Sequence, residues 1–207
     1  DLACARAMFG LDYLVFRPHN VYGERQNLGD RYRNVIGIFI NQAMQGLPCT
    51  LFGDGLQTRA FTHVSEVVPA IARAAEMPQA YGEVYNLGAD HAYTVLELAE
   101  RVQEVMGSRA GVVHLPARQE VKHAYSDHSK ARATFGGTDG VSTRPVPLRE
   151  GLERMARWAR TVGPQKPSVF GAIEIERVVV DIKAGSSEGG NKPSLASHHP
   201  ERSGCVR

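Results

Sequence analysis

The sequence has few cysteines and no long apolar segment. Its three cysteines, Cys4, Cys49 and Cys205, share no common spacing, and an odd number without a pattern favours reduced thiols over a disulfide framework. No set of cysteines and histidines has the spacing of zinc ligands. No apolar run approaches the roughly 20 residues that a transmembrane helix needs. These absences predict a cytoplasmic protein with no disulfide scaffold, no metal site and no membrane partner.

An excess of charge of one sign is also missing. The chain has 24 Lys and Arg residues against 22 Asp and Glu residues, which gives a net charge of +2. A balance this close does not predict a nucleic-acid partner. The hydrophobic content of 43% and charged content of 22% are those of an ordinary globular protein.

Apolar periodicity and cap residues predict helices and strands that alternate along the chain. Thr94 and Glu97 have the spacing of a capping box, in which each side chain satisfies a free backbone amide of the first turn. The predicted helices cover 2–9, 35–45, 64–76, 94–106, 127–136 and 147–162. The predicted strands cover 13–16, 50–52, 83–87 and 112–115. This alternation is typical of an α/β fold.

Two polar strings follow predicted strands. Residues 17–23 read Arg-Pro-His-Asn-Val-Tyr-Gly, and residues 51–61 read Leu-Phe-Gly-Asp-Gly-Leu-Gln-Thr-Arg-Ala-Phe. Arg59 in the second string offers a planar fork of donors that fits a diphosphate. By residue type alone, an arginine paired with a carboxylate on a sheet surface is the commoner arrangement. Phe52 by residue type is a core side chain, and His19 a structural histidine.

Both strings resemble segments of the NAD-dependent epimerase/dehydratase family, the extended short-chain dehydrogenases/reductases of the UDP-glucose 4-epimerase type. Residues 116–127 resemble a third segment of the same family, and the resemblance covers roughly residues 1–176. It implies NAD as cofactor, a UDP-sugar as substrate and a homodimer for the full-length enzyme. The departures include Ala60 where the family has Asp and Glu24 where it has Pro.

Two family motifs are missing from the chain: the glycine-rich dinucleotide loop and the Tyr-x-x-x-Lys pair. The chain is therefore expected to be the C-terminal part of such an enzyme, without a catalytic residue of its own and inactive alone. The expected fold is α/β, with an incomplete Rossmann-type parallel sheet and a smaller substrate-binding α/β domain. The sheet remnant is assigned to 1–23 and 60–90, the substrate domain to 24–59 and 91–162, an extension to 163–182, and a disordered tail to 183–207.

The resemblance also implies roles for individual residues. Arg59 and Arg118 hold the diphosphate of the nucleotide, Phe52 lies beside the base, and Glu120 holds a ribose hydroxyl. The substrate-binding candidates are Asn20, Asn34, Val35, Phe52, Arg59, Arg118, Glu120 and Tyr125. Pro18 and His19 are the candidates for contact with the cofactor. Lys122, His123, His128 and Lys130 are interpreted as a solvated charged face.

Three alternatives to an epimerase stay open. A nucleotide-sugar 4,6-dehydratase and a UDP-glucuronate decarboxylase belong to the same family and differ in catalytic groups that these segments do not contain. A non-catalytic nucleotide-sugar-binding fragment is an alternative of another class. Residues 185–194 superficially resemble a phosphate-binding loop, but the Gly-Lys-Ser/Thr order is broken and no helix is predicted to follow.

Overall fold

The computed structural model describes residues 1–30, 33–136 and 145–166, all within one compact unit, Asp1–Phe170. The predicted disordered tail, and the predicted extension beyond residue 166, lie outside the described residues. The helices are α1 (Leu2–Phe9), α2 (Val35–Met44), α3 (Val64–Ala74), α4 (Val95–Met106), α5 (Ser129–Phe135) and α6 (Leu148–Val162), with a 3-10 turn at Pro78–Ala80. The strands are β1 (Val15–Pro18), β2 (Val21–Tyr22), β3 (Cys49–Phe52), β4 (Thr58–Ala60), β5 (Thr62–His63), β6 (Val84–Leu87), β7 (Ala92–Thr94), β8 (Val112–Leu115) and β9 (His123–Ala124).

The strands form small, mostly parallel sheets. β1 pairs with β6, β2 with β5 and β3 with β8, each in parallel. β4 lies between β7, to which it is antiparallel, and β9, to which it is parallel. The prediction of an α/β fold is confirmed. The first strand begins two residues later than predicted, because its register with β6 pairs Val15 with Val84 and Pro18 with Leu87.

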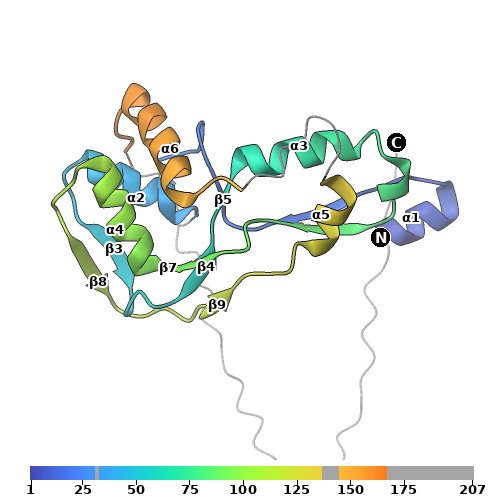
Figure 1. Cartoon of the computed structure of the whole chain (residues 1–207). Helices are drawn as coiled ribbons and strands as arrows, with labels where there is room; N and C mark the ends of the chain where they lie inside the picture. Colours follow the sequence, from blue (N-terminus) through green and yellow to red (C-terminus); the bar gives the residue numbers. More distant parts are fainter. Residues whose placement is uncertain (31–32, 137–144, 167–207) are drawn as a thin grey trace, which may run out of the picture. The chain divides into compact units, whose positions relative to one another are not determined.

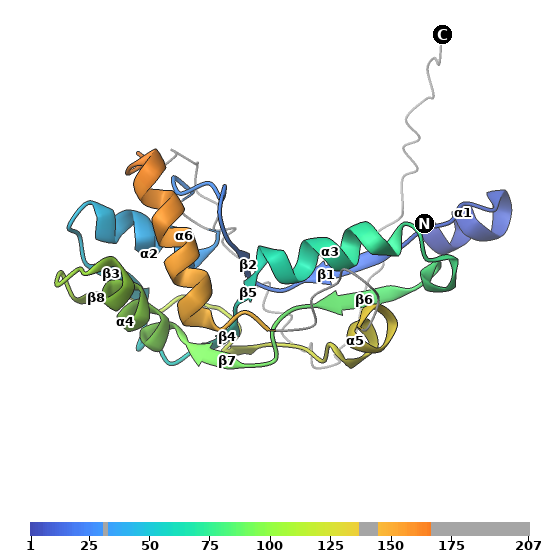
Figure 2. The same cartoon turned by 45° about the horizontal axis from the view of Figure 1, so that its top comes forward.

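One hydrophobic cluster, called here the helical cluster, forms where α2, α4 and α6 meet. In both views α6 (orange) runs beside α2 and α4 (Figures 1 and 2). The α4 helix begins at the predicted capping box: the Glu97 amide donates to Thr94 Oγ1 at 3.1 Å, and the Thr94 amide donates to Glu97 Oε2 at 2.8 Å. The buried side chains of the three helices are Ile36, Phe39, Ile40, Leu98, Val102, Leu148, Leu152 and Met155.

A second cluster, the strand-pair cluster, forms against β1 and β6. Tyr85 and Leu87 of β6 are buried there, and Phe16 of β1 packs against them. The helices α3 and α5 supply Val67, Ala70, Ala74, Ala131 and Phe135, and the segment after α3 supplies Met77 and Ala80. Figure 2 shows β1 and β6 side by side next to α3.

The inward face of α3 differs from the predicted one. Apolar periodicity predicts an inward face of Val64, Val67, Val68, Ile71 and Ala75 for this helix, whereas the structure buries Val67, Ala70 and Ala74. Val68 and Ile71 are 53% and 39% exposed. Alanine side chains let the helix approach its neighbours closely, so the small residues face inward although larger apolar ones are present. Among the described residues, no helix is both long enough and apolar enough to cross a bilayer.

Candidate functional site

A cavity of about 640 Å³ opens beside the helical cluster. It is lined by residues of α2, β3 and β4, and by the segments that follow β1 and β8. Seven of the ten residues singled out in the sequence line it: Asn20, Asn34, Val35, Phe52, Arg59, Arg118 and Glu120. Residues that are up to 100 positions apart in the sequence are therefore gathered around one space.

Arg59 is held in place by one carboxylate and two carbonyl groups. Its Nη2 lies 3.1 Å from Glu120 Oε2, and its Nη1 donates to the carbonyls of Thr58 and Lys122 at 2.8 and 3.2 Å. Alternation along β4 buries the neighbouring Ala60 completely and turns Arg59 toward the cavity. The carboxylate partner expected from residue type is thus present, and the same guanidinium lines the cavity.

Phe52 and Arg118 lie against each other. Leu51 is buried, so the alternating pattern of β3 places the Phe52 ring on the opposite side, at the cavity. The Arg118 guanidinium carbon lies 3.4 Å from the centroid of the Phe52 ring, a cation–π contact that covers one ring face. Gln57 joins this group because its Nε2 donates to the Phe52 carbonyl at 3.3 Å and to Glu120 Oε1 at 3.1 Å.

Two asparagines in the cavity wall have left-handed backbone conformations. The φ angles are 40° at Asn20 and 61° at Asn34, a region that asparagine tolerates better than most residues. The Asn20 side-chain amide donates to the carbonyl of Ala60 at 3.0 Å, which ties the turn after β1 to β4. Asn34 precedes α2, and its own side chain makes no capping hydrogen bond.

Three of the ten residues do not line this cavity. Pro18 ends β1, and His19 follows it with Nδ1 3.2 Å from Ser126 Oγ. Tyr125 is 62% exposed and has no place in the wall of either described cavity.

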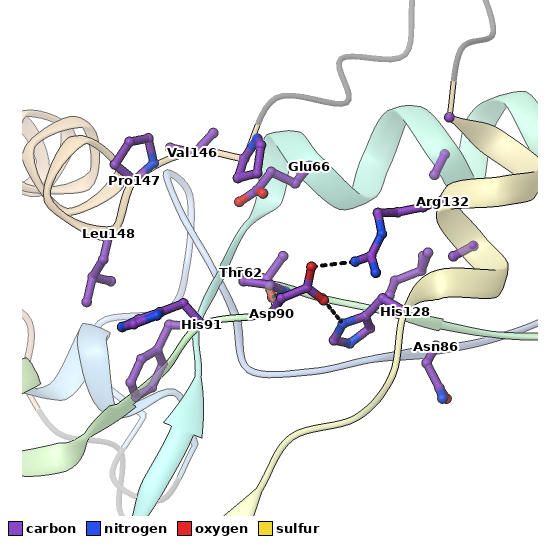
Figure 3. A pocket seen from close by; sticks show the side chains of 18 of the residues that line it. Thr62, Glu66, Asn86, Asp90, His91, His128, Arg132, Val146, Pro147 and Leu148 are labelled. Atoms are coloured by element: carbon purple, nitrogen blue, oxygen red, sulfur yellow. Dashed lines mark hydrogen bonds and ion pairs between the residues drawn. The ribbon is translucent and has the colours of Figure 1, made fainter.

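A second cavity, of about 450 Å³, contains polar residues that the sequence did not indicate. Asp90, in the loop between β6 and β7, lies between Arg132 and His128 (Figure 3). The hydrogen bond from Arg132, followed by that from His128, holds the pKa of Asp90 below its usual value. The interpretation of His128 as part of a solvated face is wrong, since only 2% of it is exposed. Its partner Asp90 is remote in sequence, so no local spacing indicated the pair.

Comparison with known proteins relates part of the chain to a known family. Residues 2–88 match the model of the NAD dependent epimerase/dehydratase family. UDP-glucuronic acid decarboxylase 1 of Arabidopsis thaliana is 35% identical over 147 residues, 70% of this chain and 32% of that protein.

Solved structures of epimerases resemble the chain as well. The Thermotoga maritima UDP-glucose 4-epimerase with UDP-glucose has a TM-score of 0.68 and 32% identity, and the likeness covers 78% of this chain and 50% of that one. The Bacillus cereus UDP-glucuronic acid 4-epimerase in complex with UDP-glucuronic acid and NAD has a TM-score of 0.68 and 26% identity, over 78% and 49% of the two chains. The chain thus spans about half the length of these epimerases, and about a third of the decarboxylase.

The family match corrects one expectation. The chain as a whole was expected to be the C-terminal part of an enzyme of this family, but residues 2–88 match the family's NAD-binding region. This range contains β1, α3 and β6, the parallel strand pair and one of the helices that pack on it. The expectation relied on two missing motifs, and a missing motif does not identify the region to which the remaining strands belong.

Proposed function

We propose that the 640 Å³ cavity binds the nucleoside diphosphate of a UDP-sugar, in an NAD-dependent nucleotide-sugar epimerase of the UDP-glucose 4-epimerase type. One observation carries this proposal: Arg59, from β4, and Arg118, from the segment after β8, both line the same cavity. The ring of Phe52, from β3, lines it too and lies against Arg118. Two guanidinium groups on one cavity suit a diphosphate, whose oxygens accept bidentate hydrogen bonds.

The surrounding groups suit the rest of a nucleotide. The Phe52 ring lines the cavity and offers an aromatic surface on which a base stacks. Glu120 supplies acceptor oxygens for ribose hydroxyls and already orients Arg59. With Glu120 ionised, the three groups carry a net charge of +1, which favours a diphosphate anion over a neutral sugar. Asn20 and Asn34 add amide groups to the wall of the cavity, and Val35 adds an apolar side chain.

Pro18 and His19 are proposed to contact the cofactor. They lie at the carboxyl end of β1, and the carboxyl ends of parallel strands are where ligands of α/β folds bind. NAD, when bound, would supply the acceptor and donor of hydride. The role of these residues of the chain is to shape and orient the binding surface. Homodimer assembly is proposed on the family resemblance alone, and a cytoplasmic location on the three cysteines without a common spacing.

A decarboxylase of the same family is the second candidate, because UDP-glucuronic acid decarboxylase 1 of Arabidopsis thaliana is 35% identical. In a decarboxylase this cavity would bind the same nucleoside diphosphate, because the substrate of that enzyme is also a UDP-sugar. Both candidates therefore predict binding of UDP, and only an assay with each sugar separates them. The inactivity of the chain alone remains a prediction.

Calorimetric titration of the chain with UDP tests the proposal. Loss of a hydrogen bond to a charged group costs about 1.5–3 kcal/mol, so Arg59→Ala and Arg118→Ala should each weaken UDP binding about tenfold or more. Arg59→Lys should recover only part of the affinity, because an ammonium lacks the planar fork. Arg73 is the matched control: it pairs with Glu76 at 2.8 Å on α3 and lines neither cavity, so Arg73→Ala should bind UDP normally. Unchanged affinity in both cavity variants would refute the assignment.

A further inference from the structure

Four polar side chains outside the proposed nucleotide cavity form a continuous line of hydrogen bonds. Asp90 Oδ1 lies 3.1 Å from His128 Nδ1, and His128 Nε2 lies 3.1 Å from Ser126 Oγ. Ser126 Oγ in turn lies 3.2 Å from His19 Nδ1. The line therefore runs from the loop between β6 and β7 to the residue that follows β1.

The fold holds the two ends of this line together. Thr62, which is fully buried, donates its hydroxyl to the carbonyl of His19 at 3.1 Å and accepts from the amide of Ala89 at 2.8 Å. A Cβ at Gly88 would lie 2.7 Å from His128 Nε2 and 3.3 Å from His19 Cβ, so only glycine leaves room for both histidines. Asn86 donates to the carbonyl of Asp127 at 3.2 Å, which fixes the segment that carries Ser126 and His128.

The direction of each hydrogen bond follows from its partners. Asp90 is ion-paired with Arg132, so its carboxylate only accepts, and His128 must carry its proton on Nδ1. In the neutral ring, His128 Nε2 is then an acceptor and takes the Ser126 hydroxyl proton. The Ser126 oxygen accordingly accepts from His19 Nδ1, and His19 Nε2 is left as an acceptor. In the described residues, no hydrogen-bond partner of His19 Nε2 is found.

We propose that Asp90, His128 and Ser126 form a proton relay that fixes His19 with its proton on Nδ1 and presents Nε2 as a proton acceptor at the carboxyl end of β1. A proton taken up at Nε2 is matched by transfer of the Nδ1 proton to Ser126 Oγ and of the Ser126 hydroxyl proton to His128 Nε2. The four side chains together gain one proton, and the resulting positive charge lies on the buried His128, next to Asp90.

The chemistry that the relay would serve is proton removal from a hydroxyl group of a ligand bound next to His19. That step rests on the proposed function, which places a ligand there, whereas the relay itself depends only on the four side chains. Besides Asp90, the charged or titratable groups in the wall of the cavity that His128 lines are Glu66, His91, Tyr93 and Arg132. Figure 3 shows Glu66, His91 and Arg132 around this cavity. Lys130, on α5 with Arg132, pairs with Glu83 instead.

Long-range ¹H–¹⁵N correlation spectra of the ¹⁵N-histidine-labelled chain, without ligand, test the relay. His19→Gln and His128→Gln assign the two rings. Near neutral pH both rings should show the Nδ1–H tautomer in the wild-type chain. Ser126→Ala should abolish the preference of His19 for this tautomer, and Ser126→Thr, which keeps the hydroxyl, should restore it.

The matched control is Ser129→Ala, because Ser129 lies in the same segment and bonds to Asp127 instead of a histidine. It should leave both tautomers unchanged. An Nε2–H tautomer at His19 in the wild-type chain would overturn the proposal, whatever the variants do. Labelling of Ser126 by a fluorophosphonate would also overturn it, since Ser126 would then be a nucleophile. Because no ligand is present, failure of UDP binding leaves this test intact.

Discussion

The helices of the helical cluster bury their large apolar side chains, whereas α1 and the outer face of α3 expose theirs. Phe39, Leu98 and Leu152, one from each helix of the helical cluster, are completely buried. On the other side of the comparison, Met8 and Phe9 of α1 are 73% and 78% exposed, and α1 has no buried residue. Val68 and Ile71 of α3 face solvent in the same way in the described part of the chain.

The difference shows what each region can support. The proposed nucleotide cavity lies against the helical cluster. There α2, which supplies part of the cavity wall, packs against α4 and α6. Sites on packed elements hold their side chains more precisely than sites on loops. The strand pair instead buries Tyr85 and Leu87 of β6, while Val84 of the same strand is exposed.

The largest expected difference between the two regions is in stability. Leu152→Ala removes a fully buried side chain from the helical cluster, and such truncations cost about 2–5 kcal/mol. Ile71→Ala, on the exposed side of α3, is the matched control and should change the free energy of unfolding by less than about 0.5 kcal/mol. Urea denaturation followed by circular dichroism measures both. Equal losses would show that α3 packs more tightly than the structure indicates.

Thiol reactivity gives the next contrast. Burial raises the pKa of the Cys49 thiol from 9.0 to about 11, whereas Cys4 on α1 is exposed. A rise of this size leaves about a hundredfold less thiolate at pH 8, and burial also blocks the reagent. In a Cys205→Ser background, a disulfide reagent should therefore modify Cys4 at least about a hundredfold faster than Cys49. Mass spectrometry of the quenched reaction identifies the site, and comparable rates would contradict the described packing.

The smallest expected effect comes from a helix cap. The helices α3 and α4, one in each cluster, both begin at a capping box, with His63 and Thr94 as the capping residues. Thr94→Ala removes the acceptor for the Glu97 amide and should lower the free energy of unfolding by about 1 kcal/mol. Thr94→Ser keeps the hydroxyl and should lose much less. If serine and alanine gave the same loss in thermal melts, the hydroxyl would not be what stabilises α4.

Local patterns in the sequence predicted the six α-helices and the strands β1, β3, β6 and β8 of the described residues, because the causes of these elements are local. The two-residue strands β2, β5 and β9 were not predicted. The capping box at Thr94 and the alternation that buries Leu51 and exposes Phe52 to the cavity each depend on a few neighbouring residues. The inward face of α3 was missed, because alanines and not the larger apolar residues face β1, β6 and α5. Periodicity alone does not show which of two adjoining faces meets a partner.

Some residues of the two cavities were selected from the sequence, and others were recognised only from the structure. Arg59, Phe52, Arg118 and Glu120 were all selected because their segments resemble segments of one family, and all four line the 640 Å³ cavity. The buried His128 was missed, since its burial and its bond to Asp90 depend on how distant segments meet. The assignment of the chain to a C-terminal part was wrong because motifs absent from the sequence carried that inference. The division into two domains remains a prediction.

The central position of β4 limits how this sequence can vary over evolution. Arg59 is held in register with Tyr93 on one side and with Ala124 on the other. Inserting or deleting one residue between Phe52 and Thr58 would shift β4 by one position and turn Arg59 away from the cavity, with Ala60 in its place. Relatives that retain the arginine should therefore keep the length of this turn.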